Sequence, residues 1–226
     1  MIGRWIRIMT RARYVEGGID SLVYKTFFPK SMSGVFVDVG AGDTVYLSIS
    51  RFFERKGWRV IIIEPNPVFA AAHRKLGHEV YEFACADFEA DGNSFDLVSS
   101  NGVLDEGRIT YEAGSALKLR GELPPGMTKS LIKVNVRKLD TILLQYAKLS
   151  RIDILSVDVE WWELEVLKGI DLNLFRPRVV ILENIKKSTL HRQTMNHHGY
   201  DLWRRSDPND IYIRRWHTEY STFKAK

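Results

Sequence analysis

Disulfide bonds within the chain are excluded, because its 226 residues include a single cysteine, Cys85. A chain this poor in cysteine is typical of a reducing compartment, so we expect a cytoplasmic protein. No apolar run approaches the roughly 18 residues that a membrane span needs. The first residues also lack the apolar core of a signal peptide, and the sequence contains neither internal repeats nor low-complexity linkers.

An excess of one charge is lacking as well. Lys and Arg number 33 against 28 Asp and Glu, the net charge is +5, and the two signs are interspersed through most of the chain. This balance does not favour nucleic acid as the partner. Apolar residues make up 45% of the chain and charged residues 27%, which excludes a disordered protein and predicts one globular domain with appendages.

The amino-terminal segment, residues 1–33, is predicted to stand apart from the main domain. Within residues 2–14, apolar and basic side chains alternate at helical spacing, with Ile2, Trp5, Ile6 and Met9 on one face and Arg4, Arg7 and Arg11 on the other. The pattern predicts a basic amphipathic helix. Such a helix either makes peripheral contact with an anionic membrane surface or packs on the domain or on a partner chain in an oligomer.

Strand and helix patterns alternate from residue 34 to residue 216, and residues 217–226 follow as a tail. The predicted strands are Val35–Val39, Arg59–Ile63, Val80–Ala84, Ile152–Val157 and Arg178–Leu182, then a hairpin of Tyr200–Arg205 and Asp210–Arg215. Predicted helices lie between them, beginning near Val45, Asn66, Glu163 and Ser188. This order predicts an α/β fold with a doubly wound, mostly parallel sheet and a carboxyl-terminal antiparallel hairpin.

Residues 94–131 break this alternation. The segment begins with a probable hairpin pattern and then becomes rich in glycine and proline around Pro124 and Pro125. It is too long for an ordinary connection, so it is either a lid over the ligand-binding edge of the sheet or a disordered excursion.

The strongest local motif is the glycine turn in Phe36–Thr44, where a predicted strand feeds a predicted helix. Gly40 and Gly42 allow the backbone to approach a ligand closely, and the start of the helix would offer N–H donors to an anionic group. Dinucleotide-binding turns need a third glycine, and Val45 stands in its place. Asp38 instead suits S-adenosylmethionine, because a carboxylate can oppose its ammonium group or its positive sulfur.

Two further acidic residues extend this cofactor hypothesis. Glu64 ends the second predicted strand, 24 positions after Gly40, where a carboxylate accepts hydrogen bonds from both ribose hydroxyls. The alternative is a strand-end glutamate in solvent. Asp87 follows the third predicted strand, where it either accepts from the adenine amino group or caps a turn.

The sequence resembles the FkbM-type methyltransferases from about Val35 to Arg215. The motifs that carry the resemblance are Phe36–Thr44, Ile63–Pro67, Leu139–Thr141, Leu155–Glu160, Glu163–Gly169 and Ile181–Asn184. The resemblance implies a Rossmann-like class I methyltransferase that moves a methyl group from S-adenosylmethionine to a hydroxyl of a sugar, a glycan or a secondary metabolite. The cofactor residues that we expect are Asp38, Gly40, Gly42, Asp43, Glu64 and Asp87.

One pair of residues departs from the family pattern. After the Asp-x-Glu motif the family usually has glycine and then a small residue, whereas this chain has Trp161 and Trp162. Two indoles at the mouth of the sheet either line a sugar-binding face or pack into the core at the start of a helix.

The catalytic residues are predicted at the ends of the fourth and fifth strands. Asp158 ends one strand, and Glu183 and Asn184 end the next. Oxygen ligands at neighbouring strand ends suit Mg²⁺, so Asp158 is predicted either to bind the metal with Glu183 and Asn184 or to act as the base. Glu160 is a further catalytic or substrate contact. The alternatives are a helix cap for Asp158 and an ion pair for Glu183.

Other functions are open at this point. An RNA methyltransferase would use basic residues near both ends, together with Trp203 and Trp216. A protein of this fold that binds the cofactor without catalysis would use Trp161 and Trp162 to block the acceptor site. The histidines, including His73, His78 and His191, are not assigned a role in the site.

Overall fold

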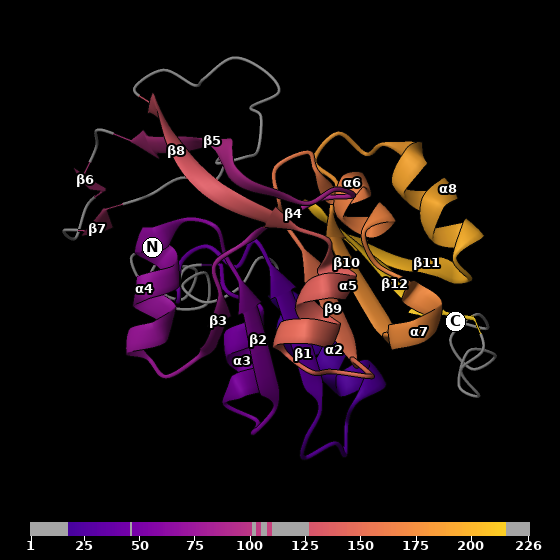
Figure 1. The fold of residues 1–226 in the computed structure, drawn as a ribbon. Coiled ribbons are helices and arrows are strands. Elements are labelled where there is room, and N and C mark those ends of the chain that lie inside the picture. The colour runs from indigo at the N-terminus through magenta and orange to yellow at the C-terminus, as the bar shows by residue number, and fades with distance from the viewer. Residues whose placement is uncertain (1–17, 46, 101–102, 105–107, 110–126, 216–226) are drawn as a thin grey trace, which may run out of the picture.

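The computed structural model describes residues 18–45, 47–100, 103–104, 108–109 and 127–215 (Figure 1). The fold is mixed α/β, with a mostly parallel central sheet and some antiparallel strands. In space the order of its seven strands is β11-β12-β10-β9-β1-β2-β3. Their bounds are β1 Val35–Val39, β2 Arg59–Ile63, β3 Glu79–Tyr81, β9 Ile154–Val157, β10 Val179–Glu183, β11 Tyr200–Ser206 and β12 Asn209–Arg214.

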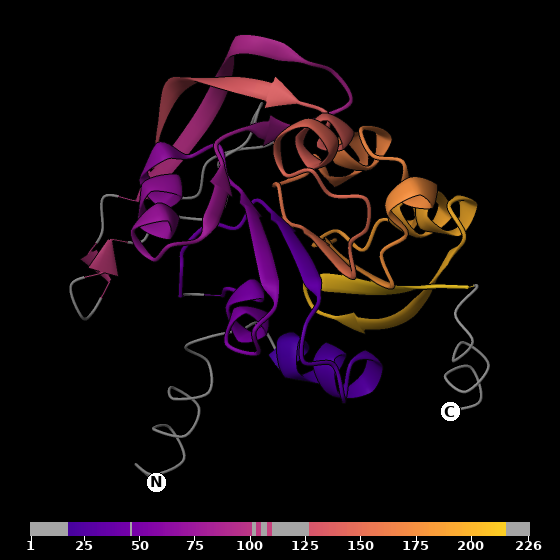
Figure 2. The ribbon, with the colours of Figure 1, turned by 60° about the horizontal axis from the view of Figure 1, so that its bottom comes forward.

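The direction in which the sheet grows reverses between β1 and β9. The chain runs outward from β1 to β2 and β3, then returns to the other side of β1 and continues through β9 and β10. These five strands are parallel, so their carboxyl ends share one edge, whereas β12 runs antiparallel to both β10 and β11. In Figure 2 the pair β11 and β12, in yellow, forms one end of the sheet, which agrees with the predicted closing hairpin.

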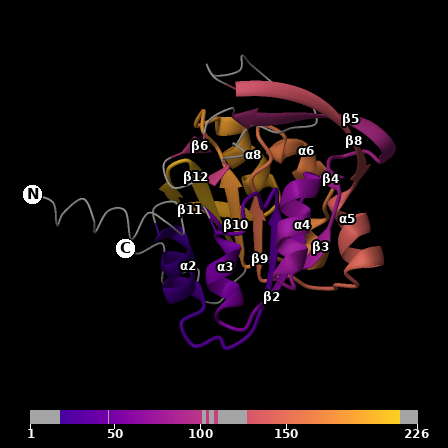
Figure 3. The same ribbon diagram turned by 90° about the vertical axis from the view of Figure 1, so that its left-hand side faces the viewer.

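Both faces of the central strands are buried, which explains their nearly continuous apolar sequences. One face packs against α2 (Ile19–Phe27) and α3 (Ser50–Glu54) through side chains such as Phe36 and Phe53. The other face packs against helices from the second half of the chain, including α6 (Glu163–Lys168). Figure 3 views the sheet from its side, with α2 and α3 on one side of it and α5 on the other.

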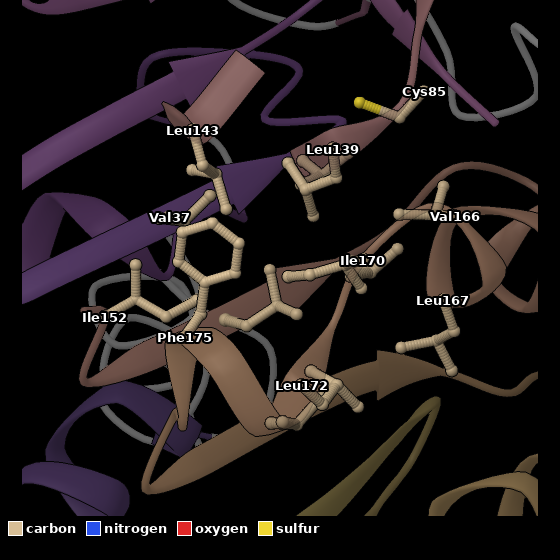
Figure 4. Packing of buried hydrophobic residues seen from close by; sticks show 14 of the residues in the cluster. Val37, Cys85, Leu139, Leu143, Ile152, Val166, Leu167, Ile170, Leu172 and Phe175 are labelled. Atoms are coloured by element: carbon tan, nitrogen blue, oxygen red, sulfur yellow. The ribbon is translucent and has the colours of Figure 1, made fainter. Parts of the chain in front are cut away.

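The helices on the second face bury the larger apolar cluster. Their bounds are α5 Leu139–Thr141 with the π-helical turn η2 Ile142–Tyr146, α6 Glu163–Lys168, α7 Leu172–Phe175 and α8 Thr189–His197. Figure 4 shows Phe175 and Ile152 beside Val37 of the central strand, with Leu143 and Leu139 nearby. All five of these side chains are inaccessible to solvent.

Helix limits follow local capping chemistry. The side chain of Asn66 accepts a hydrogen bond from Val68 N at the start of α4 (Pro67–Lys75), and that of Ser188 accepts one from Leu190 N at the start of α8, as predicted. The prediction of a helix beginning near Val45 was wrong, because α3 begins only at Ser50. Between them, Leu47 has φ of +58°, a left-handed conformation that interrupts a helix.

The predicted strand Val80–Ala84 is split between two sheets. Its first half belongs to β3 at the edge of the central sheet, whereas Ala84 and Cys85 form β4, which pairs with β8 (Met127–Arg137). A long antiparallel partner of β8, β5 (Ala90–Ser100), completes this three-stranded sheet. In Figures 1 and 3 the hairpin of β5 and β8 lies beyond the carboxyl ends of the central strands.

The predicted insertion at 94–131 lies within a longer hairpin, because β5 begins before residue 94 and β8 ends after residue 131. Phe95, Val134 and Val136 anchor these strands in a small apolar cluster with Ala84 and Ala86. A short pair, β6 (Val103–Leu104) and β7 (Arg108–Ile109), lies between them. The glycine- and proline-rich part of the segment lies outside the described residues.

The predicted amphipathic helix of residues 2–14 and the tail of residues 217–226 lie outside the described residues, whereas most of the lead-in to residue 33 is described. Residues 1–17 and 216–226 lie outside the described part, and α2 occupies most of what remains of the lead-in. Among the described residues, no helix combines the length and the apolar character that crossing a membrane requires.

Two adjacent residues of α7 test the importance of the larger apolar cluster. Replacing buried Phe175 with alanine is expected to lower the free energy of unfolding by about 3–5 kcal/mol, because it leaves a cavity among packed side chains. Leu174→Ala is the matched control, since Leu174 is 48% exposed and its loss should change stability by no more than about 0.5 kcal/mol. Urea unfolding of both variants measures the difference, and equal losses would contradict the assigned core.

Candidate functional site

The centre of the candidate site is the point where the winding of the sheet reverses. Ligands of open α/β sheets bind in the crevice beyond the carboxyl ends of the strands at such a point. Here Gly40 N donates to Ile63 O of β2 at 2.9 Å, and Asp158 N donates to Val39 O at 2.9 Å. These bonds tie the end of β1 to both of its neighbours.

Gly40 is required by this close approach. Its φ is +79°, and a Cβ added there would lie 1.8 Å from the carbonyl oxygen of Asp158. A side chain at this position would therefore push β9 away from β1. At Gly42, where φ is +57°, a Cβ would lie in open space. Glycine is therefore favoured there by the backbone conformation and not by a close contact.

Glu64 connects the glycine turn to the next segment of the edge. Its Oε2 accepts a hydrogen bond from Gly42 N at 2.8 Å, and its Oε1 accepts one from Asn66 N at 2.8 Å. The residue is only 5% exposed. The alternative of a strand-end glutamate in solvent is thus wrong, because this carboxylate is buried and bonded to the turn, and the ribose contact stays a prediction.

The two buried carboxyl groups at this edge are hard to ionise. Burial raises the pKa of Glu64 to about 7, although the N–H groups of Asn66 and Gly42 oppose the rise. Burial also raises the pKa of Asp38 to about 6, while hydrogen bonds from Ser50 and Ser156 lower it in part. The charge of Asp38 adds to the shift at Glu64, so the two groups titrate as neighbours.

A histidine that sequence reasoning placed far from the site supports the same turn. His73 Nε2 lies 3.0 Å from Gly42 O, and its Nδ1 lies 2.8 Å from His78 Nδ1. Burial lowers the pKa of His73 to about 4, so its ring is neutral at pH 7. Because a carbonyl only accepts, the proton of His73 is on Nε2 and its Nδ1 accepts from His78.

The chain of contacts continues to the protein surface. His78 Nε2 lies 2.8 Å from Glu54 Oε1. The carbonyl of Gly42 is therefore held by an ordered series of three side chains.

The remaining predicted cofactor residues lie further out. Asp43 is exposed, and its Oδ1 accepts from Val45 N at 2.7 Å, which closes a turn where a helix start was predicted. Asp87 is exposed and follows β4, which pairs with β8 and not with the central sheet. The structure thus places Asp87 after a strand of the second sheet, and its expected contact with adenine remains a prediction.

Three carboxylates gather on the other side of the reversal point. Asp158 and Glu160 follow β9, Glu183 ends β10, and one oxygen from each lies within 4.8 Å of the other two. Oxygen ligands on opposite sides of Mg²⁺ are about 4 Å apart. The cluster therefore offers three oxygen ligands of the kind that a divalent cation takes, and a cation would offset the repulsion among its charges.

Asn184, which was predicted as a metal ligand, makes three hydrogen bonds within the protein. Its Oδ1 accepts from Ser188 N at 2.8 Å, and its Nδ2 donates to Asp210 Oδ2 at 2.7 Å and to Ser188 O at 3.1 Å. The residue thus connects the turn before α8 to β12, and its role as a metal ligand stays a prediction. Glu160, which was predicted as a catalytic or substrate contact, lies in the carboxylate cluster with Asp158 and Glu183.

The departure from the family pattern is accommodated by a strained loop. Glu160 and Trp161 both have positive φ, +54° and +78°. Trp161 therefore keeps a backbone conformation that favours glycine, at a cost of roughly 1–2 kcal/mol. Buried Glu163 holds the loop, because its Oε1 accepts from Trp161 N at 3.1 Å and from Val159 N at 3.3 Å.

The two tryptophans are placed differently. Trp161 lines a cavity next to the carboxylate cluster, and the ammonium of Lys186 lies 4.0 Å from the centre of its ring. Trp162 is half-buried, immediately precedes α6, and is not among the residues that line this cavity. Trp161 therefore lies beside this cavity, and the expected sugar-binding role of the two tryptophans stays a prediction.

A pair of glycine variants tests the reversal point. Gly42→Ala is expected to cost about 1–2 kcal/mol of unfolding free energy, because only its backbone conformation is strained. Gly40→Ala adds a clash with the Asp158 backbone, so it should cost about 1–3 kcal/mol more. Urea unfolding measures both, and equal costs at the two positions would show that the close approach at Gly40 is not a constraint.

Comparison with known families agrees with this geometry. A model of the Methyltransferase FkbM domain matches residues 38–202, that is, 165 of the 226 residues of the chain. The match runs from the glycine turn to the first strand of the closing hairpin and includes both carboxylate groups described above. No curated protein matched the chain. The chain belongs to the FkbM methyltransferase family.

Proposed function

We propose that the protein is an O-methyltransferase that uses S-adenosylmethionine to methylate a hydroxyl of a small-molecule or glycan acceptor. The observation that carries the proposal is the pair of sites on either side of the reversal point. Glu64 and the glycine turn lie on the β2 side, and the carboxylates Asp158, Glu160 and Glu183 lie on the β10 side. A donor and a nucleophile bound in these sites would meet at the ends of β1 and β9.

The fold supports this assignment. A sheet whose winding reverses beside its first strand, with helices on both faces, is the arrangement expected of a doubly wound Rossmann-like methyltransferase. We infer that the β5–β8 hairpin, which lies beyond the ligand edge, acts as the lid that the sequence predicted. Closing such an edge would exclude water from the reacting groups.

The residues on the β2 side fit the cofactor. Glu64 can accept hydrogen bonds from two ribose hydroxyls through the lone pairs that its two backbone N–H contacts leave on its oxygens. Gly40 and Gly42 keep the turn clear of side chains, and Asp38 supplies negative charge beneath it. When bound, the cofactor supplies a methyl group on a positive sulfur.

The work of the chain is to position and activate the acceptor. Holding donor and acceptor at near-attack distance can supply about 7–11 kcal/mol of the barrier. A hydroxyl is a weak nucleophile while it keeps its proton, so a neighbouring base must take it. Asp158 is the base that we propose, because it lies at the reversal point, with Glu160 contacting the acceptor.

A divalent metal is the second way to activate the hydroxyl. Asp158, Glu160 and Glu183 would hold Mg²⁺, and the metal would supply charge that lowers the pKa of the acceptor hydroxyl. Under either alternative Asp158 faces the reacting oxygen. Measurement of metal binding decides between these two ways of activating the hydroxyl.

A small-molecule or glycan acceptor is favoured over RNA by the contacts of the closing hairpin. Arg205 pairs with Asp207 and Asp210, and Arg215 pairs with Asp201, so these charges are neutralised within the protein. Trp203 packs edge-on against Phe27, with ring centres 4.8 Å apart, and is engaged in the apolar cluster. Of the two tryptophans predicted to stack on bases, Trp203 is therefore engaged in the fold, and Trp216 lies outside the described residues.

Cofactor affinity should depend on the charge of Glu64. As pH rises through about 7 its carboxyl loses its proton and gains acceptors for the ribose, so affinity for S-adenosylhomocysteine should increase from pH 6 to 8 and then level off. Asp38 adds a smaller increase near pH 6. Titration calorimetry measures both the affinity and its pH slope.

Glu64→Gln is expected to weaken binding roughly 10- to 100-fold at pH 8, the value of one or more charge-assisted hydrogen bonds. It should also remove the increase between pH 6.5 and 8. Glu79→Gln is the control, because the Glu79 carboxylate contacts Arg59 and Tyr81 and not the glycine turn. Wild-type affinity and an unchanged pH slope in Glu64→Gln would contradict the proposed cofactor site.

The metal proposal has a direct test that needs no acceptor. Binding of Mn²⁺, a hard cation that takes the same ligands as Mg²⁺, can be followed by electron paramagnetic resonance of the unbound ion. Asp158→Asn and Glu183→Gln should each weaken Mn²⁺ binding at least about tenfold, since each removes one of three charged ligands. Asp91→Asn, which changes an exposed ion pair, should bind as wild type does. Equal affinities in all four proteins would leave Asp158 as a metal-free base.

A further inference from the structure

Gly42, in the glycine turn, is held at both ends by buried side chains from different elements. Its N–H donates to Glu64 Oε2 at 2.8 Å, and its carbonyl oxygen lies 3.0 Å from Nε2 of His73. Glu64 is 5% exposed and His73 is 1% exposed. The proposed cofactor site uses Glu64, whereas the contact from His73 has no part in it so far.

The carbonyl of Gly42 needs a partner to keep its orientation. A Cβ added to Gly42 would meet no described atom within 4 Å, so packing around its Cα does not fix the peptide that joins it to Asp43. Glycine adopts positive and negative φ about equally well, so the turn could direct this carbonyl in more than one way. The hydrogen bond from His73 selects one of these directions.

His73 is suited to donate this bond. Burial lowers the pKa of its ring to about 4, so the ring is neutral at pH 7 and carries one proton. Its Nδ1 lies 2.8 Å from Nδ1 of His78, and Nε2 of His78 lies 2.8 Å from Glu54 Oε1. An N–H of His78 directed at Nδ1 leaves the proton of His73 on Nε2, where it faces the carbonyl of Gly42.

The two contacts of Gly42 lead to the same helix. Glu64 Oε1 accepts a hydrogen bond from Asn66 N, and Asn66 caps the start of α4. His73 lies near the other end of α4, two residues before Lys75, its last residue. Gly42, Glu64, α4 and His73 therefore form a closed series of contacts. In this series the helix sets the spacing between the group that binds the Gly42 N–H and the group that binds its carbonyl.

We propose that His73 is a positioning residue for cofactor binding, whose hydrogen bond holds the Gly42 carbonyl toward α4 and away from the amino-acid end of S-adenosylmethionine. A carbonyl oxygen carries partial negative charge, so the turn would bind a carboxylate less well if this oxygen were directed at it. The inference rests on the proposed function, because it takes the glycine turn as the place where that carboxylate binds. It adds a residue outside the family motif Ile63–Pro67, which covers only the start of α4.

Two amide substitutions at position 73 separate its two contacts. A glutamine amide reaches the position of Nε2 and can donate to Gly42 O, whereas an asparagine amide reaches only the position of Nδ1, beside His78. In titration calorimetry of the full chain with S-adenosylhomocysteine, His73→Asn should weaken binding about 5- to 50-fold and His73→Gln by no more than about threefold. Lys75→Gln, exposed on the same helix, should bind as wild type does. Equal affinities of His73→Asn and His73→Gln would overturn the inference.

Hydrogen exchange of the Gly42 amide gives a readout that needs no cofactor. In His73→Asn the turn loses one of its two anchors, so this amide, which is bonded to Glu64, should exchange at least about tenfold faster than in wild type. In His73→Gln the rate should stay within about threefold of wild type. The amide of Ile62, in β2, is the internal reference, because a general loss of stability would raise both rates together. Equal acceleration at both amides would show a structural role alone and overturn the inference.

The two possible failures give different results. Tight binding of S-adenosylhomocysteine that is equal in wild type, His73→Asn and His73→Gln overturns the role of His73 and leaves the proposed function standing. Faster Gly42 exchange in His73→Asn alone, in a chain that does not bind S-adenosylhomocysteine, supports the hold of His73 on the turn and overturns the proposed methyl donor.

A second variant serves should His73→Asn fail to fold. His78→Phe removes the donor that keeps the proton of His73 on Nε2. The rate of Gly42 exchange should then rise, and the affinity for S-adenosylhomocysteine should fall, each by about 2- to 10-fold. No change in either quantity would overturn the inference.

Discussion

The backbone contact between Gly40 and Asp158 is the constraint on which the site depends. It exists because β1 and β9 are parallel neighbours whose carboxyl ends meet where the winding reverses, and because Gly40 has no Cβ to hold them apart. The contact brings together chain segments more than a hundred residues apart. It puts the Glu64 carboxylate and the glycine turn on one side and the clustered carboxylates of Asp158, Glu160 and Glu183 on the other. A transferase needs this arrangement, since its donor and its acceptor must meet within bonding distance.

The edge of the sheet around this contact lowers the stability of the fold. It contains three buried ionisable side chains, those of Asp38, Glu64 and His73. Burial raises the pKa of the two carboxyl groups and lowers the pKa of the histidine, so in each case it favours the neutral form. Glu160 and Trp161 add two consecutive left-handed residues. Strain and buried polar groups of this kind persist where the surrounding structure fixes them, and they are concentrated at functional sites. The apolar clusters on both faces of the sheet supply the stability that offsets these costs.

Strands whose limits follow from their own apolar residues were predictable from the sequence. Strands whose limits depend on pairing with a segment far along the chain were not. Both faces of Val35–Val39 and Arg59–Ile63 are buried, so their apolar runs gave the strands with their observed bounds. The strand after His78 was mispredicted because β4 pairs with β8, some fifty residues away. The sequence placed Asp158, Glu160 and Glu183 near the ends of neighbouring strands, and the structure brings these three carboxylates together. The support that His73 gives to the glycine turn was missed, yet a signal existed, because His73 lies with Ala70 on the buried face of α4.

The proposed function is tested most directly by a crystal structure of the protein with S-adenosylhomocysteine bound. It predicts the ribose hydroxyls within hydrogen-bond distance of Glu64, the amino-acid end at the Gly40–Gly42 turn, and the sulfur directed toward Asp158. The cavity beside Trp161 should remain open to the sulfur. A nucleoside bound away from the β1–β2 edge, or a sulfur facing away from the carboxylates, would contradict it.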